Sequence, residues 1–383
     1  MKKVRIGIVG VGGMGQGHIA SLKDVPEAQL TAVADIDAAV AKEVGTKAGV
    51  PWFTDHRKLV DSGLVDAVLV ATPHYFHPEI SIYAMEHGLH ALSEKPIAVT
   101  VSQADAMVAA AKKTRKVFAV MHQMRSLPEI IAARKIIEDG RLGEIQRTVL
   151  MEPNYRSQAY YDSGTWRATW AGEGGGVIMN QAPHCIDLFI LFGGLPKKIE
   201  AKWRTRLHKI EVDDEVSAVL EYKNGAWGYY YTCTNEIPRG VYMEIAGNKG
   251  KLVYRNGQLQ FFSIVGDLKE FTFKNKEMWA APEFKEEKIK LPKVQGSHAA
   301  ITRNFCRAIL YGEKLLSPGM EGLRVVEFIN AVLLSGKLGK PVETPVNRRQ
   351  YDAFLNQLKK KSKYKKIVKM QRITDPNIEK LKK

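Results

Sequence analysis

Six residues near the start of the chain constrain its fold more than any other feature: Gly10-Val11-Gly12-Gly13-Met14-Gly15. They follow the apolar run Val4–Val9, which has the composition of a buried strand, and they open a segment with helical spacing of apolar residues. In such a strand–loop–helix unit Gly10 permits a tight turn, Gly12 lets a pyrophosphate approach the backbone, and Gly15 lets helix and strand pack closely. The helix N-terminus then favours the anion. The pattern predicts a dinucleotide-binding loop, and the simpler alternative is a glycine-rich structural turn.

An acidic residue lies where the ribose of such a dinucleotide is expected. Asp35 ends a second β-rich run, Gln29–Ala34, and comes 20 residues after Gly15. A carboxylate at this point accepts hydrogen bonds from the ribose diol of adenosine and repels a 2′-phosphate. The sequence therefore predicts NAD as the cofactor, with NADP less favoured.

The first third of the chain alternates β-rich runs with helical patterns. Further strands are expected at Asp66–Ala71, His90–Ser93 and Val117–Met121, and Ser102–Lys112 has helical spacing. Strand–helix alternation favours a doubly wound parallel sheet, so the expected fold class is α/β.

Ligands of a doubly wound sheet bind outside the carboxyl ends of its strands. Ala71, Thr72 and Pro73 follow such an end, so we expect them to line the cofactor. His77 is a further candidate for cofactor binding, whereas His74 is expected on a solvated loop.

After about residue 125 strands outnumber helices. Strands are expected at Gln146–Met151, Ile199–Arg206, Glu215–Tyr222, Gly225–Thr232, Val241–Ala246 and Lys251–Tyr254. Helices are expected at Pro128–Asp139, His298–Leu310 and Glu321–Lys337. Turn signals such as Asn256-Gly257 indicate hairpins, and hence an α+β domain with a large, mostly antiparallel open sheet. The chain divides into a dinucleotide-binding domain (1–123), a second α+β domain (124–345) and a tail (346–383).

The formal net charge of +16 is concentrated in the tail. Residues 346–383 hold 13 Lys or Arg and three Asp or Glu, and so carry +10 of the total. This location of the charge argues against nucleic-acid binding by residues 1–345. The tail itself is expected to be a solvated or disordered terminus, with a helix at Gln350–Lys361. The alternative is a tail that binds nucleic acid or an anionic surface.

The cysteine pattern and the hydropathy restrict the class of protein further. The three cysteines are far apart and show no paired spacing, which predicts no metal site and fits a reducing cytoplasm. No apolar run reaches the ~18 residues that a membrane span requires. The sequence therefore predicts a cytoplasmic globular protein without a membrane partner.

A candidate reactive group follows the expected strand His90–Ser93. In Glu94-Lys95-Pro96 the lysine lies at the carboxyl end of a parallel strand and faces the cofactor side. Desolvation and a nearby nicotinium lower the pKa of such an amine, which suits proton transfer. Glu94 and Lys95 are therefore candidates for cofactor binding, and the alternative is a salt bridge at a helix start.

A second cluster runs from Gly174 to Asp187. If a helix starts near Val177, then Asn180, His184 and Asp187 share one face. Pro183 costs such a helix a hydrogen bond, so a start near Ala182 is the alternative. The three glycines indicate close approach of the backbone to a ligand or to another element. On this segment alone His184 could equally be a core histidine.

The stretch from Tyr155 to Trp170 is rich in aromatic residues and arginine. Polyols present apolar C–H faces and many hydroxyls, which rings and arginine groups match. Tyr155, Arg156 and Trp166 are candidates for substrate binding, and Arg125 is another at the domain junction. An aromatic core or an oligomer contact would give the same composition.

Together these motifs resemble the Gfo/Idh/MocA family of nicotinamide-dependent oxidoreductases. The resemblance covers nearly the whole chain up to Pro345. Its features are the glycine loop with Asp35, Val70–Pro73, Glu94–Pro96, Gly174–Asp187 and Glu321–Pro345. It implies a Rossmann domain followed by an α/β domain whose open sheet commonly mediates oligomerisation, so a homo-oligomer, dimer or tetramer, is expected.

The resemblance also implies roles for individual residues. Lys95 and His184 match the catalytic lysine and histidine of the family, and Asp187 matches an acid that commonly contacts substrate hydroxyls. Asn180 is a departure, because many relatives carry Asp there. Asn cannot take up a proton at neutral pH, so the base role is assigned to His184, with Lys95 polarising the reacting oxygen and Asn180 orienting a hydroxyl or the histidine.

These assignments predict an NAD-dependent oxidoreductase. Its substrate would be a secondary hydroxyl of a sugar, sugar derivative or cyclitol, oxidised by hydride transfer or formed in the reverse reduction. One alternative is an enzyme that cleaves a glycosidic bond through transient oxidation and elimination. The other is a nicotinamide-sensing regulator without catalysis, against which the presence of Lys95 and His184 argues.

Overall fold

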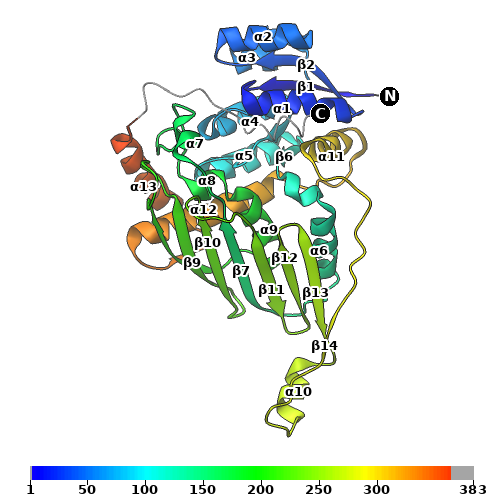
Figure 1. The fold of residues 1–383 in the computed structure, drawn as a ribbon. Coiled ribbons are helices and arrows are strands. Elements are labelled where there is room, and N and C mark those ends of the chain that lie inside the picture. The colour runs from blue at the N-terminus through cyan, green and yellow to red at the C-terminus, as the bar shows by residue number, and fades with distance from the viewer. Residues whose placement is uncertain (1, 364–383) are drawn as a thin grey trace.

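The structure of the protein is a computed structural model that describes residues 2–363. Two β-sheets organise the chain, with helices packed against both of them (Figure 1). We call the six-stranded sheet near the N-terminus sheet A and the nine-stranded sheet B. This arrangement confirms the expected fold class.

Sheet A is entirely parallel, in the order β3-β2-β1-β4-β5-β6. Its strands are β1 (Val4–Val9), β2 (Ala28–Ala34), β3 (Trp52–Phe53), β4 (Ala67–Val70), β5 (His90–Ser93) and β6 (Phe118–Val120). The helices between them are α1 (Gly13–Ser21), α2 (Ala38–Ala48), α3 (His56–Val60), α4 (His77–Glu86) and α5 (Val101–Thr114). The strand order reverses beside β1, between β2 and β4, which is where doubly wound sheets bind ligands.

Sheet B has the order β14-β13-β12-β11-β7-β10-β9-β8-β15, and among its pairs only β7 with β10 is parallel. Its longer strands are β7 (Ile145–Pro153), β8 (Lys198–Arg204), β9 (Glu215–Glu221), β10 (Trp227–Cys233), β11 (Tyr242–Gly247), β12 (Gly250–Arg255) and β13 (Gln258–Ile264). The short edge strands are β14 (Phe284–Glu286) and β15 (Val342–Glu343). The mostly antiparallel sheet expected from the turn signals is confirmed.

Helices cover one face of sheet B and leave the other bare. The covering helices include α6 (Pro128–Glu138), α9 (Pro183–Gly193) and α12 (Gly319–Leu338) (Figure 1). On β10 the Tyr230 ring packs edge-on against Phe328 of α12, with 5.2 Å between the ring centroids. The alternate residues of the strands point away from the helices, and Met151, Val219 and Tyr229 are exposed there. Sheet B therefore has one buried face and one partly apolar open face.

The chain returns to sheet A after completing sheet B. Helix α11 (His298–Tyr311) packs its buried residues Ile301 and Phe305 into the core beside β1. Asn330 of α12 accepts a hydrogen bond from the Val101 N–H at 2.9 Å and donates one to the Val99 carbonyl at 3.0 Å. The two sheets are thus joined by helices from the second half of the sequence. No helix of residues 2–363 is long and apolar enough to cross a membrane.

The expectation of a solvated tail is wrong for its first part. The helix expected at Gln350–Lys361 is confirmed as α13 (Arg348–Lys361), which begins two residues earlier, but its residues Tyr351, Phe354 and Leu355 are buried against the body. An amphipathic pattern was hidden there by the many charged residues of the segment, of which Lys359 is itself partly buried, with its Nζ 4.4 Å from the centroid of the Tyr75 ring. Residues 364–383, including the basic residues from Lys365 onward, lie outside the described part.

A segment between β13 and α11 was not foreseen from the sequence. It contains β14 and the short helix α10 (Leu268–Lys274), which has no buried residue and projects away from sheet B (Figure 1). Phe273, Met278 and Trp279 are exposed in this segment.

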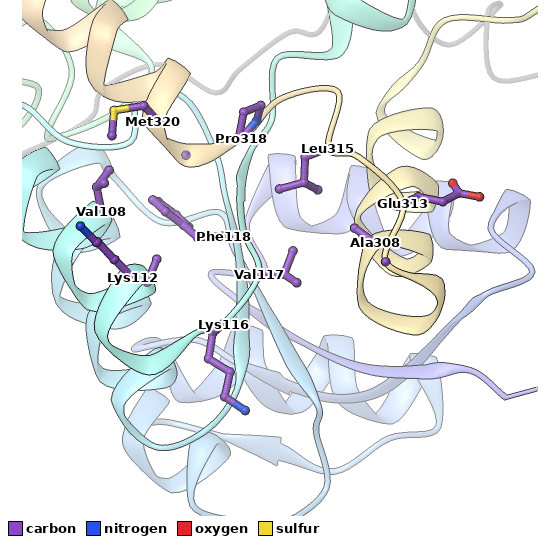
Figure 2. A pocket seen from close by; sticks show the side chains of 13 residues that line it. Val108, Lys112, Lys116, Val117, Phe118, Ala308, Glu313, Leu315, Pro318 and Met320 are labelled. Atoms are coloured by element: carbon purple, nitrogen blue, oxygen red, sulfur yellow. The ribbon is translucent and has the colours of Figure 1, made fainter.

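Figure 2 shows a cavity of about 460 Å³ between α5, β6, α11 and the start of α12. Lys116 and Val117, which line it, directly precede β6. The cavity therefore lies at the amino ends of the parallel strands, away from the carboxyl ends. None of the candidate site residues lines it.

Candidate active site

The glycine loop has the geometry that a dinucleotide pyrophosphate needs. Gly10 has φ +86°, and a Cβ there would lie 2.8 Å from the Ala71 carbonyl oxygen. A Cβ on Gly15 would lie 2.0 Å from the Gly10 carbonyl oxygen, so only glycine lets α1 begin this close to β1. Residues 12–14 are exposed at the start of α1, where a Cβ on Gly12 would meet nothing within 4 Å. Open space beside a helix N-terminus fits a bound pyrophosphate.

Asp35 lies beside this loop, at the end of β2. Its Oδ2 accepts a hydrogen bond from the Val11 N–H at 2.9 Å, and its Oδ1 accepts one from the Asp37 N–H at 3.0 Å. Each carboxylate oxygen keeps a second lone pair. The carboxylate is therefore fixed in place and can still accept the hydroxyls of a ribose.

The loop after β4, which contains Thr72 and Pro73, lies in the same region as the glycine loop and Asp35. His77 lies behind this loop, with its Nε2 2.7 Å from the Thr72 carbonyl oxygen and its Nδ1 2.8 Å from the Pro96 carbonyl oxygen. The ring is buried, so it ties the loop after β4 to the loop after β5. This placement makes His77 a support of the cofactor region.

The expectation that His74 lies on a solvated loop is wrong. Its ring is 5% exposed, and Nδ1 lies 3.0 Å from the Glu173 carbonyl oxygen. Trp166 packs edge-on against the ring. A segment almost 100 residues away covers the histidine, and no local pattern announces such a contact.

Glu94 is anchored by a residue that the sequence analysis missed. Its Oε1 lies 2.7 Å from Nε2 of His18 on α1, and both side chains are buried. Burial opposes the charge on Glu94, yet the His18 hydrogen bond and the nearby positive groups lower its pKa to about 2. The carboxylate therefore stays ionised and joins α1 to the end of β5.

Lys95 reaches from the end of β5 into the second half of the molecule. Its Nζ donates a hydrogen bond to the Asn180 carbonyl oxygen at 2.8 Å. Burial lowers the pKa of the amine, while the charge of Glu94 opposes that shift. The amine is thus desolvated and fixed beside the Asn180–His184 segment.

That segment is a broken helix. Helix α8 (Val177–Asn180) ends before α9, which begins at Pro183. Proline is well suited to the first turn of a helix because its missing N–H has no partner there anyway. The start near Ala182 is therefore correct, and the continuous helix from Val177 is wrong.

The glycines before α8 allow two elements to touch. A Cβ on Gly176 would lie 1.8 Å from the Asp213 carbonyl oxygen, and one on Gly174 would lie 2.1 Å from Val99 Cγ1. The Asp213 carboxylate accepts hydrogen bonds from the N–H groups of Gly176 and Ile178 at 2.7 and 3.0 Å. Of the two alternatives, close approach to another element is confirmed, and it fixes where α8 starts.

His184 lies in the first turn of α9, four residues after Asn180. Its Nε2 lies 3.4 Å from Nε2 of Gln123, and its Nδ1 is buried without a hydrogen-bond partner in the described range. Burial lowers the pKa of the ring well below its ordinary value, and Lys95 and His122 add to that shift. The imidazole is therefore neutral at pH 7 and able to accept a proton.

Arg125 and Asp187, both candidates for substrate binding, lie close together and form an ion pair with each other. Arg125 Nε and Nη2 donate to the two Asp187 oxygens at 2.7 and 2.6 Å, and both side chains are buried. Arg125 also donates to Glu321 at 3.3 Å and to the Leu316 carbonyl at 3.1 Å. This pair holds α9 against the domain junction, so the structure gives both residues a partner that the sequence did not indicate.

The other substrate candidates lie on the segment that covers the site. Arg156 Nη1 donates to Asn154 Oδ1 at 2.7 Å and to the Tyr155 carbonyl at 2.9 Å. The Trp166 ring lies under the Arg167 guanidinium, 4.5 Å from ring centroid to Cζ. All of these side chains are partly accessible.

Tyr160 is a contact that was not singled out from the sequence. Its hydroxyl oxygen accepts hydrogen bonds from Arg167 at 2.7 Å and Gln181 at 2.8 Å, with Asn180 Nδ2 at 3.4 Å. A phenol oxygen that accepts two bonds directs its own proton elsewhere. The Tyr-rich composition of the stretch was the only available signal.

The fold and the site define a class of protein. A Rossmann domain presents an NAD-type loop and a desolvated lysine at the carboxyl edge of its sheet, and a second domain brings a neutral histidine to the same edge. In the described residues no group of three His, Cys, Asp or Glu side chains is arranged to hold a metal ion. This is the architecture of a nicotinamide-dependent oxidoreductase.

The chain belongs to the Gfo/Idh/MocA oxidoreductase family. The family model of the NAD-binding Rossmann fold matches residues 4–122, and the model of the GFO/IDH/MocA C-terminal domain matches residues 130–253. The resemblance inferred from the motifs is thereby confirmed, and NAD is the cofactor of this family domain.

Individual relatives act on sugars and cyclitols. Levoglucosan dehydrogenase of Pseudarthrobacter phenanthrenivorans is 27% identical over 300 residues, 68% of this chain and 76% of that protein. The scyllo-inositol 2-dehydrogenase (NADP(+)) IolU of Bacillus subtilis is 29% identical over 57% of this chain and 66% of that protein. The structure of the WlbA dehydrogenase from Bordetella pertussis with NADH and UDP-GlcNAcA aligns with a TM-score of 0.76, at 26% identity, over 90% of this chain and 100% of that one.

Proposed function

We propose that the protein is an NAD-dependent dehydrogenase. It oxidises a secondary hydroxyl of a sugar, sugar derivative or cyclitol, or catalyses the reverse reduction. The observation that carries this proposal is the Lys95 Nζ hydrogen bond to the carbonyl of Asn180, which comes four residues before the neutral His184 in the sequence. The relatives that act on sugars and cyclitols support the substrate class.

The two side chains have complementary tasks in this reaction. Lys95 donates a hydrogen bond to the reacting oxygen and stabilises the negative charge that develops on it. His184 accepts the hydroxyl proton, as a neutral imidazole can. Bound NAD would supply the redox chemistry by accepting hydride from the carbinol carbon. The substrate thus loses one proton and one hydride and becomes a ketone.

A panel of sugars, sugar acids and cyclitols, each tested with NAD and with NADP, examines this proposal. We expect at least one compound to give reduced nicotinamide, and Lys95→Ala and His184→Ala each to abolish that reaction. Full turnover by both variants on an identified substrate would refute the assignment. Product formation without any release of NADH would favour the elimination chemistry instead.

We infer NAD preference from Asp35. Its carboxylate oxygens are held beside the glycine loop by the Val11 and Asp37 amides. A 2′-phosphate at that position would meet a fixed negative charge. The kcat/KM ratio for the two cofactors on one substrate measures the preference, and a ratio favouring NADP would contradict it.

We further propose that the open face of sheet B forms a homo-oligomer contact. Val219, Tyr229 and Val149 stand side by side on three paired strands, and Met151 and Trp227 are exposed near them. A contiguous apolar face of this kind is characteristic of an interface. Light scattering should report a dimer or tetramer, and Tyr229→Glu should shift it toward the monomer; a monomeric parent protein would contradict the proposal.

A further inference from the structure

Glu173 is a buried carboxylate in the site to which the mechanism so far gives no task. It precedes the three glycines and is 2% exposed. Its Oε2 accepts a hydrogen bond from the Ala168 N–H at 2.6 Å, and its Oε1 accepts a short one from Asn180 Nδ2. The nearest cation in contact with it is Arg167, whose Nη1 lies 3.9 Å from Oε1.

The contact with Glu173 determines which way the Asn180 amide points. A carboxylate is only an acceptor, so the NH₂ group of Asn180 must face it. Its second donor direction leads to the Tyr160 hydroxyl at 3.4 Å. Oδ1 is then turned away from both groups, and no hydrogen bond to it is formed by the described residues. It is available to accept a hydrogen bond from a substrate hydroxyl.

The main chain of the same residue holds the lysine. The Asn180 carbonyl oxygen accepts the Lys95 Nζ hydrogen bond at 2.8 Å. Fixing the Asn180 side chain therefore also restrains the turn that positions Lys95. His74 adds a second brace, because its Nδ1 lies 3.0 Å from the Glu173 carbonyl oxygen.

We propose that Glu173 is a positioning residue for the dehydrogenase reaction. It locks the Asn180 amide so that Oδ1 accepts a substrate hydroxyl while the Asn180 carbonyl holds Lys95. Glu173 thereby supplies, from seven residues upstream, the carboxylate that position 180 lacks. The expected change in KM rests on the proposed function, whereas the fixed orientation of the Asn180 amide rests on the contacts alone.

The charge of Glu173 responds to pH in the neutral range. Burial raises its pKa to about 7, and Arg167, the Ala168 N–H and Asn180 oppose that rise. The charged or titratable groups that face it are Arg167, Lys95, Asp213, Tyr161 and His74. Above pH 7 the ionised carboxylate holds the amide, whereas below pH 7 the protonated acid becomes a donor and permits the amide to turn over.

The first test needs no substrate. In the full-length protein the side-chain ¹⁵N–¹H signals of Asn180, assigned through Asn180→Asp, should shift with a midpoint near pH 7 in the parent protein. Glu173→Gln should remove that titration. Asn180 side-chain signals that are the same in Glu173→Gln as in the parent protein would overturn the proposal, and this result does not depend on any activity.

The second test measures the split between KM and kcat on a substrate found in the panel. Loss of one fixed hydrogen bond costs about 1 kcal/mol, so Glu173→Gln should raise KM roughly fivefold to tenfold and change kcat much less. The rise of KM below pH 7 should be lost in this variant. Glu173→Asp should retain part of both effects.

Exchanging the carboxylate at position 173 with the amide at position 180 distinguishes a role in positioning Asn180 from a role in stabilising the loop alone. In Glu173→Gln/Asn180→Asp a Gln amide faces a carboxylate, so we expect KM to return to within about threefold of the parent value. A matched control is Glu327→Gln, which removes another buried carboxylate, one that accepts the Val346 N–H and pairs with Arg348. It should lower stability without altering KM or its pH dependence.

Glu173 variants that lose stability but keep the parent KM and pH profile would show a loop brace only and overturn the proposal. If Glu173→Gln does not fold, the same measurements on Glu173→Asp, together with the pH titration of the Asn180 signals in the parent protein, test the proposal. If no compound of the panel is turned over, the proposed function fails, while the NMR titration still tests Glu173.

Discussion

The cofactor side and the substrate side of the site are built by different means. On the cofactor side Gly10, Gly15 and Asp35 are set by the backbone of neighbouring elements β1, α1 and β2. On the substrate side Lys95 is positioned by Asn180, 85 residues further along the chain, and both belong to a buried polar network. Substitutions of the glycines on the first side should therefore act through sterics, and substitutions on the second side through charge and pH.

The largest effect is expected where the substrate side meets the reacting atoms. Lys95→Met keeps much of the side-chain volume but removes the ammonium group that polarises the oxygen. We expect kcat/KM to fall up to about 10³-fold, the upper end of the range for loss of a donor that stabilises a developing oxyanion, with NAD affinity nearly unchanged. Steady-state kinetics measure kcat/KM, and cofactor titration measures NAD affinity. An equal loss of kcat/KM and of NAD affinity would contradict the distinction between the substrate side and the cofactor side.

On the cofactor side the addition of a single methyl group should be enough to weaken NAD binding. A Cβ on Gly15 would lie 2.0 Å from the Gly10 carbonyl oxygen, so Gly15→Ala must displace the loop. We expect NAD affinity to fall about 100-fold, because amide donors at a helix N-terminus act only at short range. Calorimetric titration with NAD gives the dissociation constant.

Gly17→Ala is the matched control on the same helix, since a Cβ there would meet nothing within 4 Å. It should leave NAD binding intact and raise stability slightly, because alanine is the better helix former. If both variants bound NAD equally well, the steric account of the loop would be wrong.

A smaller change on the cofactor side should alter which cofactor is used. Asp35→Ser removes the negative charge that faces a 2′-phosphate and keeps a hydroxyl for hydrogen bonding. We expect the preference for NAD over NADP to shift toward NADP by roughly tenfold, equivalent to about 1.4 kcal/mol. Ratios of kcat/KM with one substrate report the shift, and an unchanged ratio would remove Asp35 from cofactor selection.

The smallest effect concerns stability on the substrate side. Burial raises the pKa of Glu152, at the end of β7, from 4.5 to about 8. The folded protein therefore keeps a proton that the unfolded chain loses above pH 4.5, so this group makes stability fall as pH rises from about 4.5 to about 8. Glu152→Gln should gain on the order of 2 kcal/mol over the parent protein at pH 8.5, relative to pH 5.

Denaturant unfolding at the two pH values measures that gain. Glu200→Gln, at an exposed position on β8, is the control and should not change the pH dependence. Glu94 provides the opposite sign, because its pKa is lowered to about 2 and its contribution is lost only as pH falls below 4.5. A difference in stability between Glu152→Gln and the parent protein that is the same at pH 5 and pH 8.5 would contradict the account of Glu152.

How much could be predicted from the sequence follows the same division. The glycine loop, Asp35 and five of the six strands of sheet A depend on local backbone demands, and they lie within a residue or two of the expected ranges; the two-residue edge strand β3 was not expected. The start of α9 at Pro183 is also a local signal. The motif residues Lys95 and His184 were recognisable because their residue types and spacing resemble those of the family.

The contacts between distant segments could not be predicted. His18 against Glu94 and Arg125 against Asp187 each join elements more than 60 residues apart, which must be placed before the contact can form. The burial of α13 was hidden by its lysines, since charge dominates its composition while Tyr351 and Phe354 occupy one face. Long-range packing decides these cases, and composition does not reveal it.

The central claim is that Lys95 and His184 serve an NAD-dependent oxidation of a sugar or cyclitol hydroxyl. The most direct measurement is the absorbance of reduced nicotinamide when the purified protein is mixed with NAD and each compound of the panel, in parallel with His184→Ala. We predict NADH formation by the parent protein on at least one compound and at least a 100-fold lower rate with the variant, as for loss of a general base. Equal rates with and without the His184 imidazole would contradict it.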